Sequence, residues 1–189
     1  MRPGYYGIAV ILALLSAAVM GQTRPAGQND ADAKPGVGPM RVEHLKGFSY
    51  IYVSRQATLK TIGQVFSVEV PKLLAALKTG EIQLRGGLIA VYHGMTADRN
   101  QKFDVDIGFP VDEGAMAPEG YQLVPLNAAD CATVLFSGHM AEIGQAYQQL
   151  YSRLYARGLQ PAPETREYYL YVEDYDSPNN VVLVAVVLK

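Results

Sequence analysis

The feature that most constrains the fold is a pattern that occurs twice along the chain. The tripeptide Ile-Gly-Gln at residues 62–64 recurs at residues 143–145, 81 positions later, and each copy opens a segment with helical spacing of apolar residues. The same offset gives Phe66 the position in its segment that Tyr147 has in the other. The two segments predict helices over residues 61–78 and 141–157. Two helices with the same opening indicate an internal repeat.

Each predicted helix lies among segments with the composition of β-strands. The predicted strands span residues 48–53, 86–93, 103–111, 121–124, 132–136, 166–173 and 181–188. We therefore expect an α+β fold of two strand–helix–strand–strand units related by a pseudo-twofold axis. This fold has a mainly antiparallel sheet, two helices and a cleft between the units. Pro71 lies within the first helical pattern, and we expect it to kink that helix or to split it in two.

The first 39 residues differ from the rest of the chain. After Arg2, residues 8–20 are apolar and uncharged and end among small residues, which is typical of a secretory signal peptide. An uncleaved membrane anchor is the alternative, although the strongly apolar stretch is shorter than the roughly 20 residues that a spanning helix needs. Residues 22–39 are rich in Gly, Ala, Pro and polar side chains and predict a flexible linker.

These patterns predict a signal peptide or uncleaved anchor over residues 1–21, the linker over 22–39 and one domain over 40–189. A protein with such a start is exported, and we expect it to be periplasmic or secreted. The only membrane attachment that we expect is through the N-terminal segment, if that segment is not cleaved.

Charge and residue types exclude several kinds of partner. A net charge of −2 and the lack of a basic run argue against nucleic acid as a partner. His44, His93 and His139 do not have the spacing of metal ligands, and we expect neither a metal nor another cofactor. The single cysteine, Cys131, rules out an intramolecular disulfide, and we expect its thiol to be buried.

One predicted strand near the C-terminus combines a carboxylate with aromatic rings. Because successive side chains of a strand alternate between its faces, we expect Glu167, Tyr169 and Tyr171 on one face. A carboxylate beside aromatic rings can hold an organic cation through charge pairing and cation–π attraction. The alternative is a solvated glutamate that pairs with Arg166 or Arg157.

Residues 132–170 carry a resemblance to a known family. After the strand at 132–136 come a small-residue turn, the second predicted helix, a Gly-x-x-Pro stretch and a strand with Glu followed by Tyr. This order resembles the GyrI-like effector-binding domain family, and residues 103–111 are similar to its strand that ends in Gly, an apolar residue and Pro. The resemblance covers residues 40–189 and implies a cleft for small hydrophobic or cationic molecules. In that family a glutamate on the penultimate strand lies in the cleft and pairs with cations, and the matching residue is Glu167.

The chain departs from the family pattern in two places. Polar or small residues around Arg153 replace an aromatic residue, often tryptophan, late in the second helix. The turn before that helix is Ser137-Gly-His-Met140, where the family has a His-x-Gly-Pro type of turn. In addition, a signal peptide precedes the domain where many relatives have a DNA-binding region, which disfavours a direct role in transcription.

The candidate ligand-binding residues come from the predicted strand at 166–173, from the predicted helix at 141–157 and, by the internal repeat, from the first unit. Glu167 sets the charge preference, and the tyrosines on its predicted face line the same cleft. The tyrosine stripe of the second helix, which continues to Tyr155, serves either as a cleft wall or as core packing. The first unit contributes aromatic residues by pseudo-symmetry. The candidates are Glu167, Tyr169, Tyr171, Tyr147, Tyr151, Phe66 and Tyr92, and no residue is assigned a catalytic role.

We therefore predict a non-enzymatic exported protein that holds an apolar or cationic small molecule in an aromatic cleft. The alternative is a small hydrolase in which Glu167 activates water, although the sequence shows no second catalytic group at a recognisable spacing. A scaffold protein with a residual cleft is a third option. The ligand-binding hypothesis requires Glu167 to be buried among tyrosines without a basic partner.

Overall fold

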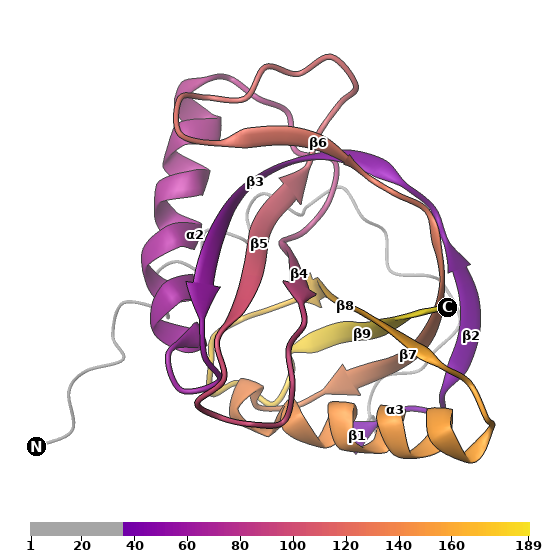
Figure 1. Cartoon of the computed structure of the whole chain (residues 1–189). Helices are drawn as coiled ribbons and strands as arrows, with labels where there is room; N and C mark the ends of the chain where they lie inside the picture. The colour runs from indigo at the N-terminus through magenta and orange to yellow at the C-terminus, as the bar shows by residue number, and fades with distance from the viewer. Residues whose placement is uncertain (1–35) are drawn as a thin grey trace, which may run out of the picture.

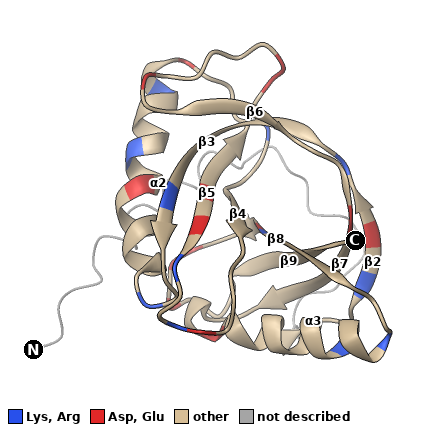
Figure 2. Cartoon of the chain, viewed as in Figure 1, with Lys and Arg blue, Asp and Glu red and all other residues tan. Residues whose placement is uncertain are grey.

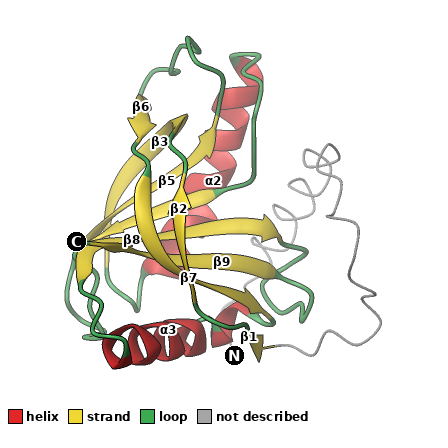
Figure 3. Cartoon of the chain, turned by 90° about the vertical axis from the view of Figure 1, so that its right-hand side faces the viewer, coloured by secondary structure: helices red, strands yellow, loops and turns green. Residues whose placement is uncertain are grey.

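One curled sheet runs through the molecule, and both long helices pack against its outer side (Figure 1, Figure 3). The computed structural model of the chain describes residues 36–189. The predicted signal peptide and most of the predicted linker lie outside these residues. Within them, no helix combines the length and the apolar character needed to cross a membrane.

The described residues form nine strands, two α-helices and one short 3₁₀ helix. The strands are β1 (Gly36–Val37), β2 (Arg41–Leu45), β3 (Phe48–Ala57), β4 (Ile89–His93), β5 (Phe103–Pro110), β6 (Gln122–Leu126), β7 (Ala129–Ser137), β8 (Pro161–Tyr171) and β9 (Val181–Leu188). The α-helices are α2 (Ile62–Thr79) and α3 (Gly144–Ala156), and the 3₁₀ helix η2 (Met140–Glu142) precedes α3.

The sheet joins the two predicted units side by side. Its strands follow the order β1-β7-β9-β8-β4-β5-β3-β6, with β2 also paired to β7, and the paired strands are antiparallel. The first unit is β3-α2-β4-β5 and the second is β7-α3-β8-β9. The units meet where β4 pairs with β8, with Ala90 opposite Glu167. This architecture confirms the α+β prediction and makes β8 a central strand.

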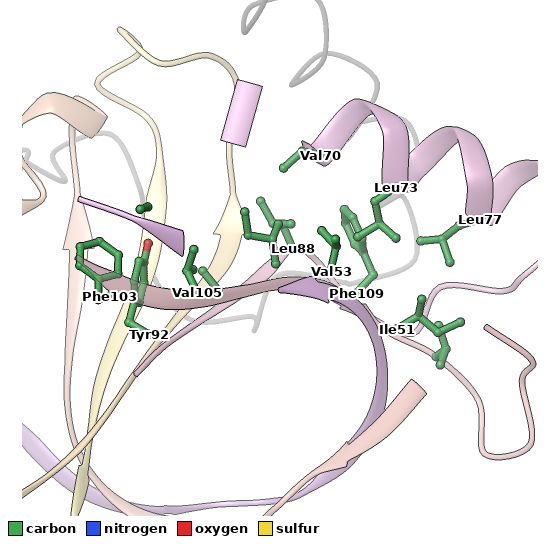
Figure 4. Packing of buried hydrophobic residues seen from close by; sticks show 14 residues of the cluster. Ile51, Val53, Val70, Leu73, Leu77, Leu88, Tyr92, Phe103, Val105 and Phe109 are labelled. Atoms are coloured by element: carbon green, nitrogen blue, oxygen red, sulfur yellow. The ribbon is translucent and has the colours of Figure 1, made fainter. Parts of the chain in front are cut away.

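Each helix covers the sheet of its own unit with a separate apolar core. Val70, Leu73 and Leu77 of α2 point toward Ile51 and its neighbours on the sheet (Figure 4). Leu150 and Leu154 of α3 pack in the same way on β7 and β9 in the second cluster. Each fully buried leucine contributes about 1.5–3 kcal/mol by leaving water, so these contacts fix each helix to its half of the sheet.

Pro71 does not split α2. The helix continues from Ile62 to Thr79 through the proline, so of the two expected effects, a kink or a split, the split is wrong. Proline removes one backbone hydrogen bond, but the residues on both sides of it, Val70 and Leu73, are buried against the same sheet. Tertiary packing therefore holds the two halves of the helix in line.

Some strand boundaries differ from those predicted. β8 begins at Pro161, in the Gly-x-x-Pro stretch before the predicted strand at 166–173, because proline is tolerated near the start of a strand. β2 was not predicted, and β1 occupies residues 36–37 at the end of the predicted linker. Both pair with β7 and extend the sheet on that side. Charged residues of both signs are spread over the helices and strands (Figure 2).

Candidate ligand-binding site

Glu167 lies at the junction of the two units, on the face of β8 that the helices cover. Its partner across the sheet is Ala90 of β4, which is fully buried in the core of the first unit. Tyr92 is the diagonal neighbour of Glu167 on β4, and Tyr169 follows it by two residues on β8, so both rings rise on the same face. Tyr169 contacts the apolar cores of both units, which places this cluster between them.

Three tyrosine hydroxyls donate hydrogen bonds to the Glu167 carboxylate. The Tyr147 hydroxyl, from α3, lies 2.6 Å from Oε1. The hydroxyls of Tyr92 and Tyr169 lie 2.8 and 2.6 Å from Oε2. The side chains that supply these donors come from one helix and two strands, so the site exists only when both units are assembled.

Glu167 is 4% exposed and has no basic partner among residues 36–189. The alternative of a solvated glutamate paired with a neighbouring arginine is therefore wrong. Arg166 points to the opposite face, where its guanidinium pairs with Glu164 at 2.6 Å. Alternation along the strand explains this separation, because adjacent residues face opposite sides of a sheet.

Burial controls the ionisation of the cluster. It raises the pKa of Glu167 above its ordinary value, while the three tyrosine hydroxyls act in the opposite direction by stabilising the carboxylate. Burial, followed by the negative charge of Glu167, raises the pKa of Tyr92, Tyr147 and Tyr169 well above the ordinary value. The tyrosines therefore stay neutral hydrogen-bond donors across the physiological pH range.

Aromatic side chains surround this polar centre. Phe66 of α2 lies with its ring centroid 5.9 Å from that of Tyr169, and Phe103 lies at the same distance from Tyr92. Tyr151, one turn after Tyr147 on α3, places its hydroxyl 3.5 Å from Thr165 Oγ1. A carboxylate inside such a ring of aromatic groups can pair with a cation while the rings contact its apolar surface.

The structure brings six of the seven candidate residues into this region. The seventh, Tyr171, is 45% exposed, and its hydroxyl donates to Glu173 rather than to Glu167. A register shift between Tyr169 and Tyr171 interrupts the alternation on which the expected shared face depends. Tyr155, at the end of the helix stripe, is 61% exposed.

The sequence reasoning missed two small residues next to Glu167. Ala90 lies opposite Glu167 on β4, and the Thr165 hydroxyl contacts the Tyr151 hydroxyl. The position of Ala90 depends on the register of β4 against β8. The sequence carries no signal for that register, because the two strands belong to different units and no short turn joins them.

Tyr168 makes a useful contrast with Tyr169, its neighbour on β8. Its hydroxyl is buried and makes no hydrogen bond of normal geometry among the described residues, although it lies close to the Arg166 guanidinium. The neighbouring guanidinium of Arg166 directs its N–H groups to Glu164 and to the Asn127 carbonyl. A buried hydroxyl without a partner is destabilising, since it loses water and gains no bond.

We therefore expect Tyr168→Phe to leave the free energy of unfolding unchanged or to raise it by about 1 kcal/mol. Tyr169→Phe removes a donor from a buried carboxylate, and we expect it to lower that free energy by about 1–3 kcal/mol. Urea denaturation of both variants at neutral pH measures the difference. Equal losses in the two variants would contradict this assignment of the hydroxyls.

The geometry agrees with a comparison against known protein families. Residues 38–186 match the family described as GyrI-like small molecule binding domain. The chain belongs to this family. The comparison with curated proteins finds no match.

Solved structures share the fold of this GyrI-like domain at low sequence identity. The structure of SAV2435 bound to tetraphenylphosphonium is 11% identical, with a TM-score of 0.59, and the match covers 80% of this chain and 94% of SAV2435. The EcmrR C-terminal domain is 14% identical, with a TM-score of 0.65, and coverage is 80% and 97%. An uncharacterized conserved protein from Listeria innocua is 12% identical, with a TM-score of 0.60, and coverage is 79% and 92%.

One departure of this GyrI-like domain from the family pattern has a structural role. Arg153, where the family often has an aromatic residue, donates one hydrogen bond to the Gly38 carbonyl at 2.6 Å and another to Gln149 Oε1 at 2.6 Å. It therefore ties α3 to the chain that leads from β1 to β2. The hydrogen bonds of Arg153 do not involve Glu167 or its tyrosines.

Proposed function

We propose that this protein is an exported small-molecule-binding protein that holds an apolar or cationic ligand in an aromatic cleft between its two units. Glu167 lies at the centre of that cleft and sets the preference for positive charge. The observation that carries the proposal is a buried carboxylate that three tyrosine hydroxyls contact and that has no basic partner in residues 36–189. A buried carboxylate left without a counter-ion favours a ligand that supplies one.

The preferred cation has a spread charge and an apolar surface. Such a cation loses less hydration free energy on burial than a compact ammonium ion. Its apolar groups contact Phe66, Tyr151 and the rings of the three hydroxyl donors, while its charge faces the carboxylate. The tyrosine hydroxyls keep the ionised carboxylate solvated as the ligand approaches.

Access to the carboxylate requires a side chain to move, since Glu167 is 4% exposed. Tyr147 is the covering donor that comes from a helix, and its bond to Oε1 is the one that a ligand approaching from α3 would replace. Glu167 then loses the hydrogen bond from Tyr147 and gains a contact with the positive charge of the ligand. Binding is favourable if the free energy gained from the charge contact exceeds the free energy needed to displace Tyr147.

Direct titration tests the proposal. SAV2435, which shares the fold, has been solved with tetraphenylphosphonium bound, so this cation is a suitable probe. We expect saturable calorimetric binding of tetraphenylphosphonium and weaker binding of the neutral triphenylphosphine oxide. Failure of both compounds to bind would contradict an aromatic cleft, and stronger binding of the neutral compound would contradict the role of Glu167.

Export rests on the N-terminal sequence, which has a basic start, an apolar stretch and small residues at its end. The intact mass of the native protein, recovered from fractionated cells, tests it. A mass that corresponds to loss of about the first 21 residues supports a cleaved signal peptide. A full-length chain in the cytoplasmic fraction would contradict export.

A hydrolase is the second candidate, and the burial of the Glu167 carboxylate among polar hydroxyls, which raises its pKa, is what favours it. A carboxylate whose pKa lies closer to neutrality is a better general base for activating water. Steady turnover of activated esters that disappears in Glu167→Gln would establish this activity. Equal turnover in the wild type and the variant would exclude Glu167 as the base.

A further inference from the structure

A second group of aromatic side chains lies on the inner face of the curled sheet, opposite the helices. Tyr50, Ile89, Val91 and Leu126 are buried there, and four partly buried residues pack against them: Phe48, Tyr52, Val124 and Tyr168. Tyr168 is the residue after Glu167, so strand alternation directs it away from the tyrosine cluster around that carboxylate. This inner-face cluster therefore takes no part in the site described above.

A pocket of about 270 Å³ lies at one end of this cluster. Its lining includes Phe48, Gly86, Ile89, Pro110, Tyr168 and Leu170. Gly86 helps to form it because a Cβ at that position would lie 3.1 Å from Pro110 Cγ. Tyr169, which donates to Glu167, also lines this pocket, whereas Glu167, Tyr92 and Tyr147 do not. The pocket therefore adjoins the candidate site at Tyr169 but does not include its carboxylate.

The charge around this pocket is balanced. Arg85 is the charged residue of the lining, and its guanidinium donates two hydrogen bonds to the Asp112 carboxylate, one of them at 2.6 Å. The other lining side chains are apolar or tyrosine. A pocket with a compensated charge and an apolar lining gives no counter-ion to a charged ligand, so desolvation disfavours both cations and anions.

Size and ring geometry narrow the ligand further. Phe48 and Tyr168 meet edge to face, with centroids 6.5 Å apart and an interplanar angle of 71°. This arrangement can accept a third ring in the same herringbone packing. A cavity of about 150 Å³ suffices to hold benzene, whereas drug-sized ligands occupy roughly 300–1,000 Å³. The pocket is therefore suited to a molecule of one or two rings.

We propose that this inner-face pocket binds small uncharged aromatic molecules, independently of Glu167. The proposal assigns the two faces of β8 opposite preferences. The helix side takes apolar cations next to a carboxylate, and the inner side takes neutral rings beside Phe48 and Tyr168.

Tryptophan fluorescence tests this site directly, because the chain contains no tryptophan. Leu170 lines the pocket and is 46% exposed, so Leu170→Trp places a single fluorophore at its rim. Leu135 on β7 is 45% exposed and does not line the pocket, so Leu135→Trp is the matched control. Nitrobenzene, a neutral one-ring contact quencher, is the probe.

We expect saturable quenching of Leu170→Trp by nitrobenzene and only linear, collisional quenching of Leu135→Trp. Adding Glu167→Gln to the Leu170→Trp protein should leave the saturable phase unchanged, as should a saturating amount of tetraphenylphosphonium. The charged analogues 4-nitrobenzoate and 4-nitrobenzyltrimethylammonium should give weaker saturable quenching or none.

Linear quenching in both tryptophan variants would overturn the proposal. Tighter binding of 4-nitrobenzoate than of nitrobenzene would also overturn it, because the pocket would then be an anion site formed by Arg85. Loss of the saturable phase in Glu167→Gln would show that the probe binds on the helix side. None of these results tests the proposed cation site, which the titration with tetraphenylphosphonium tests separately.

Discussion

Glu167→Gln is expected to weaken the binding of tetraphenylphosphonium by roughly 10- to 100-fold, which corresponds to about 1–3 kcal/mol. The substitution keeps the size of the side chain and one oxygen that can accept from a tyrosine hydroxyl. It removes the negative charge that a bound cation would face inside a site that is 4% exposed. Affinity for triphenylphosphine oxide should change little, because the contacts of a neutral ligand do not depend on that charge.

The other buried glutamate of the described residues provides a matched control. Glu69 on α2 is 7% exposed and accepts a hydrogen bond from Arg55 at 2.9 Å, and it takes no part in the tyrosine cluster. Glu69→Gln makes the same chemical change at similar burial and should leave the affinity for the cation unchanged. Isothermal titration of the three proteins with both compounds gives the comparison.

The contrary outcomes of this experiment have distinct meanings. Equal losses for the cation and the neutral compound in Glu167→Gln would mean that the carboxylate shapes the site without recognising charge. Equal losses in Glu167→Gln and Glu69→Gln would mean that the effect comes from general destabilisation. Urea denaturation of both variants identifies that case, because a folded population that falls in parallel with binding accounts for the loss.

Local patterns in the sequence were sufficient to predict the two units and to place Glu167 and Tyr169 on one face of their strand. Helical spacing predicted α2 and α3, and the shared Ile-Gly-Gln opening predicted that one unit repeats the other. That repeat also brought Tyr92 into the candidate set before any contact was known. Tyr92 now proves to donate directly to Glu167. The spacing of apolar residues predicts these elements because apolar residues recur on the side of a helix or strand that is buried.

Long-range register lies beyond such patterns. The pairing of Ala90 with Glu167 and the shift between Tyr169 and Tyr171 depend on how two units dock, and no local signal encodes them. For the same reason strand alternation overextended the predicted site to Tyr171. It correctly separated Glu167 from Arg166, because no irregularity intervenes between adjacent residues. Alternation along β8 therefore predicts the face of each side chain only as far as Tyr169, after which the register shift begins.

The site also explains why tyrosine, rather than phenylalanine, surrounds the carboxylate. Phenylalanine rings would leave the carboxylate oxygens without donors, and burial would then strongly favour the protonated form. Three hydroxyls oppose that shift and keep the ionised form accessible, although burial remains the larger influence on the pKa of Glu167. Burial therefore favours the neutral state of Glu167, and the hydroxyls, like a bound cation, favour the ionised state.

This balance leads to the second large effect, a binding affinity for cations that rises with pH. The pKa of Glu167 lies above the ordinary carboxyl value in the free protein, and a bound cation favours the ionised form. Below the raised pKa, each binding event must release a proton, so the affinity for tetraphenylphosphonium should increase about tenfold per pH unit. Above that pKa, Glu167 is already ionised, and the affinity should become constant.

The same ionisation affects stability with a defined sign. A carboxyl group whose pKa is raised by folding binds its proton more tightly in the native than in the unfolded state. The free energy of unfolding should therefore decrease as pH rises from the ordinary carboxyl value to the raised one, by up to about 1.4 kcal/mol per pH unit within that window. Glu167→Gln should lack this part of the dependence, which urea denaturation at several pH values measures.

Calorimetric titration at a series of pH values rising from the ordinary carboxyl pKa, in two buffers with different ionisation enthalpies, measures both the affinity and the proton release. The wild type should release up to one proton per cation bound at the acidic end and none once the affinity becomes constant. Glu167→Gln should show weak binding that does not depend on pH. An equal pH dependence in the variant would assign the titration to another group. An affinity that falls with rising pH would contradict a carboxylate counter-ion, since deprotonation of Glu167 can only strengthen its attraction for a cation.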